Sequence, residues 1–138
     1  MISVCMATYN GQKYIKEQID SILMQLDKND ELIISDDGSK DGTLEIIRNI
    51  NDPRIHLYNF NKGCYTKNFE NAMNHAKGDY IFLSDQDDVW IPEKIQLTLD
   101  AFARTGVDFI VSAATLVDSE KNTIIESSFD IGHTRTGF

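Results

Sequence analysis

The sequence predicts an α/β fold with a mostly parallel, Rossmann-like sheet and helices on both faces. Short apolar segments alternate with segments whose apolar residues recur at helical spacing, from residue 2 to residue 106, and this alternation is typical of βαβ units. Polar loops follow three of the apolar segments. The chain has 138 residues, of which 41% are apolar and 25% charged, so we expect one globular domain over residues 1–138.

Runs of apolar or alternating residues predict the strands. Nearly continuous apolar runs indicate strands that are covered on both faces, whereas alternation indicates one open face. The predicted strands cover residues 2–7, 31–35, 55–60, 79–84, 107–117 and 123–125.

Apolar residues recur every three or four positions between these strands and predict four helices. The first helix covers residues 12–26, with an inward stripe of Ile15, Ile19, Ile22, Leu23 and Leu26. The second follows residue 42 and ends before Pro53, and the third covers residues 66–76. The fourth begins near Pro92 and stops at Gly106, with a core stripe of Ile95, Leu99 and Phe102.

Three polar loops should meet at one edge of the sheet. They cover residues 8–11, 36–42 and 84–90, and each follows a predicted strand. In a doubly wound parallel sheet, ligands bind beyond the carboxyl ends of the strands, where the strand order reverses. The three loops are therefore expected to form one binding site.

The third loop carries the strongest chemical signal. Asp85, Asp87 and Asp88 lie within four positions, and carboxylates this close repel one another unless a cation compensates their charge. Mg²⁺ typically binds one or two carboxylates together with substrate phosphates. The chain has neither a dinucleotide-binding glycine motif nor a P-loop, so a metal–diphosphate site is favoured. The alternative is a solvated acidic turn that binds nothing.

The second loop is not a calcium-binding loop. Counting from Asp37 as the first ligand places Arg48 at the twelfth position, where an EF-hand requires a bidentate Glu. A tight turn with Asp41 as the helix N-cap is predicted instead. Asp37 is then free to accept a hydrogen bond from a ligand, for example from the imide N–H of a pyrimidine base.

Charge and cysteine usage narrow the function further. The net charge of −9 argues against a nucleic-acid backbone as the main partner. Cys5 is expected to pack as a small core residue, and Trp90 to fill the core beside the acidic loop rather than to stack on a ligand. The two cysteines and the three histidines, His56, His75 and His133, show no metal-ligand spacing.

The sequence contains neither a signal-peptide pattern nor an apolar run approaching the roughly 20 residues of a membrane span. We therefore expect a cytoplasmic protein, including one at the cytoplasmic face of the membrane. The periodic pattern fades after Ile125, so the fold is expected to be truncated at its C-terminus.

Three segments, taken in order, resemble family 2 glycosyltransferases of the GT-A fold. They are ISVCMATYNG (residues 2–11), IISDDGSKDGT (33–43) and SDQDDVWIPEK (84–94). The last segment is similar to bacterial members that build surface polysaccharides, including rhamnosyltransferase-like ones. The resemblance covers residues 2–125 and is specific for the family but not for the sugar.

This resemblance implies an inverting, metal-dependent transfer of a sugar from a UDP- or dTDP-linked donor to a glycan or lipid-linked acceptor. It also implies the strand order 3-2-1-4 and a general base beyond residue 138. The nucleotide is then lined by Ala7, Thr8 and Tyr9, and its base is contacted by Asp37.

The resemblance also implies roles for residues nearer the phosphates. Asp85 and Asp87 form an Asp-x-Asp motif, in which Asp87 is the more direct ligand of Mg²⁺ or Mn²⁺ and Asp85 lies nearer the ribose or the sugar. Lys67 stands where the family often has Arg, which implies a contact with the phosphates.

Two other functions stay open at this point. A non-catalytic or truncated sugar-nucleotide-binding domain would carry the same donor motifs. A phosphotransfer or phosphatase domain with a nucleophilic Asp is disfavoured, because its acids are expected after the first strand, where this chain has Thr8-Tyr9-Asn10.

Overall fold

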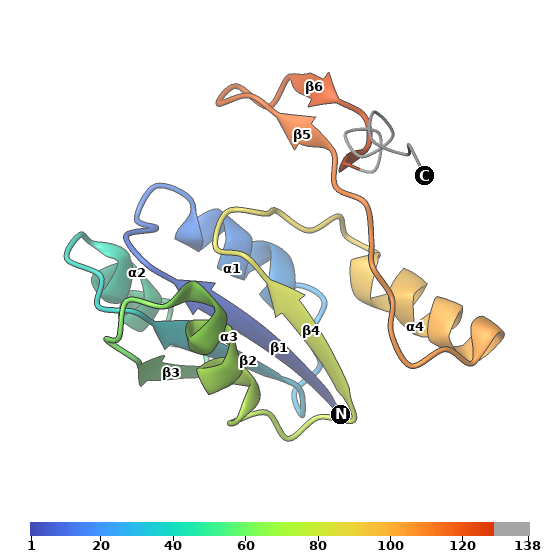
Figure 1. Cartoon of the computed structure of the whole chain (residues 1–138), viewed down its shortest axis with the longest axis horizontal. Helices are drawn as coiled ribbons and strands as arrows, with labels where there is room; N and C mark the ends of the chain where they lie inside the picture. The colour runs from blue at the N-terminus through green and yellow to red at the C-terminus, as the bar shows by residue number, and fades with distance from the viewer. Residues whose placement is uncertain (129–138) are drawn as a thin grey trace, which may run out of the picture. The chain divides into compact units, whose positions relative to one another are not determined.

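The computed structural model describes residues 1–128 (Figure 1). The chain divides into two compact units, Met1–Ile95 and Gln96–Phe138, called here the N-terminal and the C-terminal unit. All three predicted binding loops lie in the N-terminal unit. The expectation of one binding domain over residues 1–138 stays a prediction.

A four-stranded parallel sheet forms the centre of the N-terminal unit (Figure 1). Its strands run in the order β3-β2-β1-β4, as the resemblance implied. Their bounds are β1 Ile2–Thr8, β2 Glu31–Asp36, β3 Ile55–Asn59 and β4 Tyr80–Ser84. Every residue of β1 and β2 is buried, because these central strands have a neighbour on each edge and helices over both faces.

Helices cover the two faces of this sheet. On one face, Ala72 of α3 (Tyr65–Met73) packs with Cys5 and Ile33. On the other, Gln18 of α1 (Ile15–Leu23) donates a hydrogen bond to Ser84 at 2.6 Å. Ser84 is the register partner of Met6, whose side chain points away from the Cys5 face.

Helix α2 (Thr43–Ile50) contacts α1. It ends at Asn51, which adopts the left-handed conformation with φ +50°. All the observed helices start or end within a few residues of the predicted bounds. Two core predictions are also confirmed, because Cys5 is fully buried and Trp90 is 6% exposed.

The prediction of a strand over residues 107–117 was wrong. Only Leu116–Val117 forms a strand, β5, which pairs antiparallel with β6 (Thr123–Ile125) in the C-terminal unit. Val107, Phe109 and Val111 alternate as in a strand, yet all three are exposed. Alternation gives a segment strand character, but a strand also needs a neighbour for its backbone hydrogen bonds.

Helix α4 spans Lys94–Thr105 and ends at Gly106, which has a positive φ of +66°. Of its predicted core stripe, Ile95 is buried, and Leu99 and Phe102 are half-buried. No helix within residues 1–128 is long and apolar enough to cross a membrane.

Arg54 connects the start of β3 to the end of α1. Its guanidinium donates to the carbonyl oxygens of Leu23, at 3.0 Å, and Leu26. It also pairs with Asp52 at 2.8 Å, with about a fifth of each side chain exposed. The carbonyls at a helix C-terminus have no partner within the helix, so Arg54 satisfies groups that the fold leaves open.

Replacing Arg54 with Ala should lower the free energy of unfolding by about 1–2 kcal/mol, because charged hydrogen bonds are lost while the freed carbonyls regain water. Urea denaturation measures the change. Arg48→Ala, at an exposed position of α2, is the matched control and should change stability by less than about 0.5 kcal/mol. Equal stability of the two variants would contradict the bridging role.

Candidate functional site

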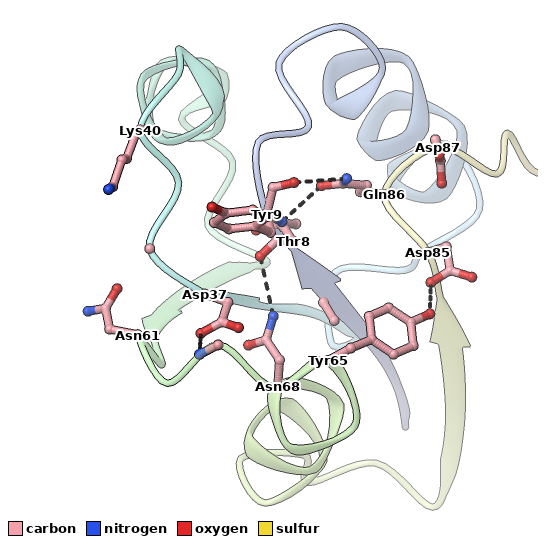
Figure 2. Close-up of a pocket in the computed structure, with 13 residues that line it drawn as sticks. Thr8, Tyr9, Asp37, Lys40, Asn61, Tyr65, Asn68, Asp85, Gln86 and Asp87 are labelled. Atoms are coloured by element: carbon pink, nitrogen blue, oxygen red, sulfur yellow. Dashed lines mark hydrogen bonds between the residues drawn. The ribbon is translucent and has the colours of Figure 1, made fainter.

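A cavity of about 850 Å³ opens at the carboxyl ends of the strands (Figure 2). It is lined by Ala7, Thr8, Tyr9, Asp37, Gly38, Lys40, Asn61, Gly63, Tyr65, Asn68, Asp85, Gln86 and Asp87. Residues from all three predicted loops are among them, together with residues before and within α3. Loops that lie up to 79 positions apart in the sequence, from Thr8 to Asp87, therefore share one wall because their strands are neighbours in the sheet.

The structure brings together most of the residues that the sequence selected. Ala7, Thr8, Tyr9 and Asp37 line the cavity, as do the two acids of the Asp-x-Asp motif. Their individual roles toward a ligand stay predictions.

Lys67 does not line the cavity and is exposed. Successive residues of a helix are rotated by about 100°, so Tyr65 and Asn68 share a face of α3 and residue 67 points to the other side. The helix therefore turns Tyr65 and Asn68 toward the cavity in place of Lys67, and a phosphate contact by Lys67 stays a prediction without support from this geometry.

Asp36 shapes the second loop from within. It is 1% exposed and accepts hydrogen bonds from the backbone N–H groups of Gly38 and Ser39, at 3.0 and 2.9 Å. Thr8 also donates its hydroxyl to Asp36 at 3.0 Å. These bonds hold the ends of β1 and β2 together, a role that the sequence analysis missed because the DD pair gives no sign of which acid points inward.

Asp37 is not free, contrary to the sequence interpretation. Its carboxylate accepts three backbone N–H groups of the next loop, those of Lys62 at 2.7 Å, Gly63 at 2.9 Å and Cys64 at 2.9 Å. Two of these bonds fall on Oδ1 and one on Oδ2. A carboxylate oxygen accepts two hydrogen bonds, so Oδ2 retains capacity for a ligand.

The prediction of Asp41 as the N-cap of α2 was wrong by one residue, because the N-cap is Gly42. The Asp41 carboxylate still accepts the N–H of Thr43 at 3.0 Å and that of Gln12 at 3.1 Å. Hydrogen bonding to Thr43 is the main cause that lowers the pKa of Asp41. Asp41 therefore fixes the first loop against the start of α2.

Gln86 joins the first loop to the acidic loop. Its amide oxygen accepts the backbone N–H of Tyr9 at 3.1 Å, and its amide nitrogen donates to the carbonyl of Tyr9 at 3.2 Å (Figure 2). A Cβ at Gly11 would lie 2.2 Å from the same amide oxygen, so a larger residue at position 11 would displace the Gln86 side chain from Tyr9. The sequence carried a signal for this role, because Gln86 stands between two acids. An amide both donates and accepts hydrogen bonds, whereas a carboxylate only accepts them.

Asn68 joins α3 to the end of β1. It is 2% exposed, and its amide donates a hydrogen bond to the carbonyl of Thr8 at 3.3 Å (Figure 2). Nothing in the sequence pattern singled out this residue, because its role depends on how α3 is rotated against the sheet.

Charge is concentrated on the acidic loop. Partial loss of hydration raises the pKa of Asp88, and the nearby carboxylates of Asp85 and Asp87 raise it further, whereas Lys94 lowers it. The ammonium of Lys94 lies 5.3 Å from the ring centroid of the buried Trp90, and burial lowers the pKa of Lys94. Trp90 also packs on Phe82 at 5.8 Å between centroids, which supports the loop from the core side.

The donor chemistry of this loop fits a hard divalent cation shared with phosphates. Asp85 and Asp87 are the two carboxylates of this loop in the cavity wall. Within residues 1–128, no three Asp, Glu, His or Cys side chains are close enough together to hold a metal alone. Two carboxylates plus phosphate oxygens from a substrate are a usual coordination for Mg²⁺, so such a site is complete only with its ligand.

Among the described residues, His56, His75 and Cys64 do not line this cavity. His75 stacks on Tyr58 with a centroid distance of 3.7 Å, and His56 lies 3.7 Å from the buried Glu31. Cys64 is half-buried and unbridged. His133 lies outside the described residues.

The profile of glycosyl transferase family 2 matches residues 3–136. The chain belongs to this family. The resemblance stated from three sequence segments is thereby confirmed over almost the whole chain.

Members of the family in bacteria show how this chain relates to longer proteins. It is 40% identical over 99 residues to the Escherichia coli UDP-Glc:alpha-D-GlcNAc-diphosphoundecaprenol beta-1,3-glucosyltransferase WfaP, covering 69% of this chain and 38% of that protein. With the E. coli enzyme of the same description, WfgD, it shares 28% over 127 residues, covering 91% and 49%. The chain spans between 21% and 51% of the length of the curated relatives it matches.

Solved structures show the same fold. The mannosyltransferase PcManGT of Pyrobaculum calidifontis, in complex with GDP-Man and Mn²⁺, superposes with a TM-score of 0.69 at 23% identity, covering 85% of this chain and 35% of that one. The parallel sheet with helices on both faces is thus the GT-A type of glycosyltransferase fold.

Replacing Asp88 with Asn should stabilise the family 2 chain slightly at pH 7. A carboxyl group whose pKa is raised on folding destabilises the folded state where it is ionised, and this cost vanishes as the pH falls below its unfolded pKa of about 4. We expect a gain below about 1 kcal/mol, because water still screens this loop.

Thermal melting between pH 7 and pH 4 measures this gain, which should shrink as the pH falls. Glu70→Gln, an exposed carboxylate of α3 outside the cavity wall, is the control. A loss of stability in Asp88→Asn at pH 7 would show that its attraction to Lys94 outweighs the repulsion.

Proposed function

We propose that this chain is the donor-binding part of an inverting, metal-dependent glycosyltransferase. Its donor is a nucleoside-diphosphate sugar, UDP- or dTDP-linked, and its acceptor a glycan or a lipid-linked glycan. One observation carries the proposal. Asp37 from the second loop and the Asp85–Asp87 pair from the third loop line the same cavity. A diphosphate donor has a base at one end and phosphates near the other, and the two acidic positions match these two ends.

In this proposal, different residues contact the two ends of the donor. Asp37 accepts a hydrogen bond from the base through Oδ2, and Ala7, Thr8 and Tyr9 contact the nucleotide from the end of β1. This leaves the phosphates at the acidic loop.

At the acidic loop, Asp87 is the more direct ligand of Mg²⁺ or Mn²⁺, and Asp85 lies nearer the ribose or the sugar. When bound, the cation supplies positive charge on the leaving diphosphate. Residues 1–128 include none to which we assign the general base.

The relatives support the donor and acceptor classes. WfaP and WfgD are named as enzymes with UDP-Glc as donor and a diphosphoundecaprenol-linked sugar as acceptor, and the PcManGT structure contains Mn²⁺. With this acceptor class, the proposal includes a full protein that is cytoplasmic and works at the cytoplasmic face of the membrane when its acceptor is lipid-linked.

Nucleotide binding should require a divalent metal. Two carboxylates alone repel a diphosphate, and they bind it only through a shared cation. Calorimetric titration of the 138-residue chain with UDP, dTDP and GDP, each with Mn²⁺ or with EDTA, tests this. Equal affinity in both conditions would contradict the metal role, and binding of none of the three with Mn²⁺ would contradict the proposed function.

Asp87→Ala should abolish the metal-dependent part of this binding and leave the melting temperature unchanged or higher. Asp87 is exposed, and its removal relieves like-charge repulsion with Asp85 and Asp88. Glu70→Gln serves again as the control for binding. A collapse of the melting temperature would show that Asp87 is structural.

Asp37→Ala should weaken the binding of UDP with Mn²⁺ by roughly ten- to hundredfold, since hydrogen bonds to a charged group contribute about 1.5–3 kcal/mol. The loss should be larger for UDP than for CDP if Oδ2 accepts the imide N–H of uracil, because cytosine has no such N–H. The melting temperature should also fall, because three backbone N–H groups lose their acceptor. A lower melting temperature with unchanged nucleotide affinity would leave Asp37 with the loop-organising role only.

A further inference from the structure

Tyr65 stands at the start of α3 and reaches across the cavity to the acidic loop. Its hydroxyl donates a hydrogen bond to Oδ1 of Asp85 (Figure 2). Both residues line the cavity, and they lie 20 positions apart in the sequence. Neither the strand pattern nor the resemblance to the family assigned Tyr65 a role.

The ring of Tyr65 is held at both ends. Its hydroxyl is fixed on Asp85, and its ring packs edge-on against Phe69, one helical turn further along α3, with 5.2 Å between centroids at 83°. The side chain is nevertheless 63% exposed. Tyr65 therefore contributes little to the buried core, and its two contacts fix the position of its side chain on the cavity wall.

The two groups set the direction of this hydrogen bond. A phenol hydroxyl can donate, whereas a carboxylate only accepts, so Tyr65 is the donor and Asp85 is the acceptor.

This bond engages one of the two carboxylate oxygens of Asp85. Oδ2 accepts no side-chain or backbone hydrogen bond from the residues that the structure describes. Without the Tyr65 hydroxyl, the carboxylate of Asp85 would have no fixed orientation, and repulsion by Asp87 would favour orientations away from it. Fixing Oδ1 removes this freedom before a ligand arrives, and such preorganisation lowers the entropic cost of binding.

We propose that Tyr65 is a positioning residue of the donor site, which orients the Asp85 carboxylate so that its second oxygen meets the nucleoside-diphosphate donor and its cation. The inference rests on the proposed function, since it names a further residue of that same site. In this proposal the first turn of α3 acts on the donor through the side chain of Tyr65 and not through that of Lys67.

Tyr65→Phe tests this, because it removes the hydroxyl and keeps the ring on Phe69. The 138-residue chain is titrated with UDP, dTDP and GDP in the presence of Mn²⁺, and the nucleotide that the wild type binds most tightly is used throughout. We expect Tyr65→Phe to weaken its affinity by about three- to tenfold. Tyr14→Phe, the same change at a partly exposed tyrosine outside the cavity wall, should leave the affinity within about twofold of wild type.

A double-mutant cycle with Asp85→Asn separates positioning from a structural role. If Tyr65 acts through the carboxylate, the loss caused by Tyr65→Phe should shrink to less than about twofold in the Asp85→Asn background. The melting temperature of Tyr65→Phe should match that of Tyr14→Phe. An equal loss in both backgrounds would overturn the inference, since Tyr65 would then act on the ligand directly or on the fold.

The outcomes also distinguish the two proposals. If the wild type binds no nucleotide with Mn²⁺, the proposed function fails. If the wild type binds and Tyr65→Phe binds equally well or more tightly, the positioning role of Tyr65 is overturned while the proposed function stands.

Discussion

Two adjacent carboxylates at the end of β2 hold together the loops that line the cavity at the carboxyl ends of the strands. Asp36 turns inward, where it accepts the N–H groups of its own loop and the hydroxyl of Thr8. Asp37 points the other way and accepts three N–H groups of the loop before α3. Backbone N–H groups in irregular loops need acceptors when they leave water, and these two acids supply acceptors for two loops at once. The position of α3 at the cavity, and with it Tyr65 and Asn68, depends on the second of these acids.

The acids around the cavity therefore divide into two groups. Asp36, Asp37 and Asp41 accept backbone N–H groups, so each negative charge is compensated by oriented dipoles. The carboxylates of Asp87 and Asp88 accept no hydrogen bond from the residues described in the structure, and that of Asp85 accepts a single one, from Tyr65. Uncompensated charge is thus confined to one loop. This is the condition under which a divalent cation and a diphosphate bind together, because each neutralises part of the other.

Side-chain amides make the connections that carboxylates cannot make. Gln86 donates to and accepts from the backbone of Tyr9, and Asn68 donates to the carbonyl of Thr8. These bonds end on Thr8, the last residue of β1, and on Tyr9, which follows it, so the start of the first loop is held from the acidic loop and from α3. A rigid first loop between two fixed neighbours is well suited to contact a nucleotide without rearrangement.

The sequence by itself determined the order of strands and helices, the buried β1 and β2, and the three loops that line the cavity. These features follow from the spacing of apolar residues, which is a local property of the chain. Tertiary structure alone decided which side chains of those loops turn toward the cavity.

Asp36 and Asp37 are neighbours in sequence with different partners, and Lys67 was chosen where Tyr65 and Asn68 line the wall. Residues 107–117 had the alternation of a strand, yet only the last two of them found a strand to pair with. In each case the outcome depends on the rotation of a helix against the sheet, or on a hydrogen-bond partner far away in the sequence. Neither is encoded in local periodicity, because both arise only when the segments pack together.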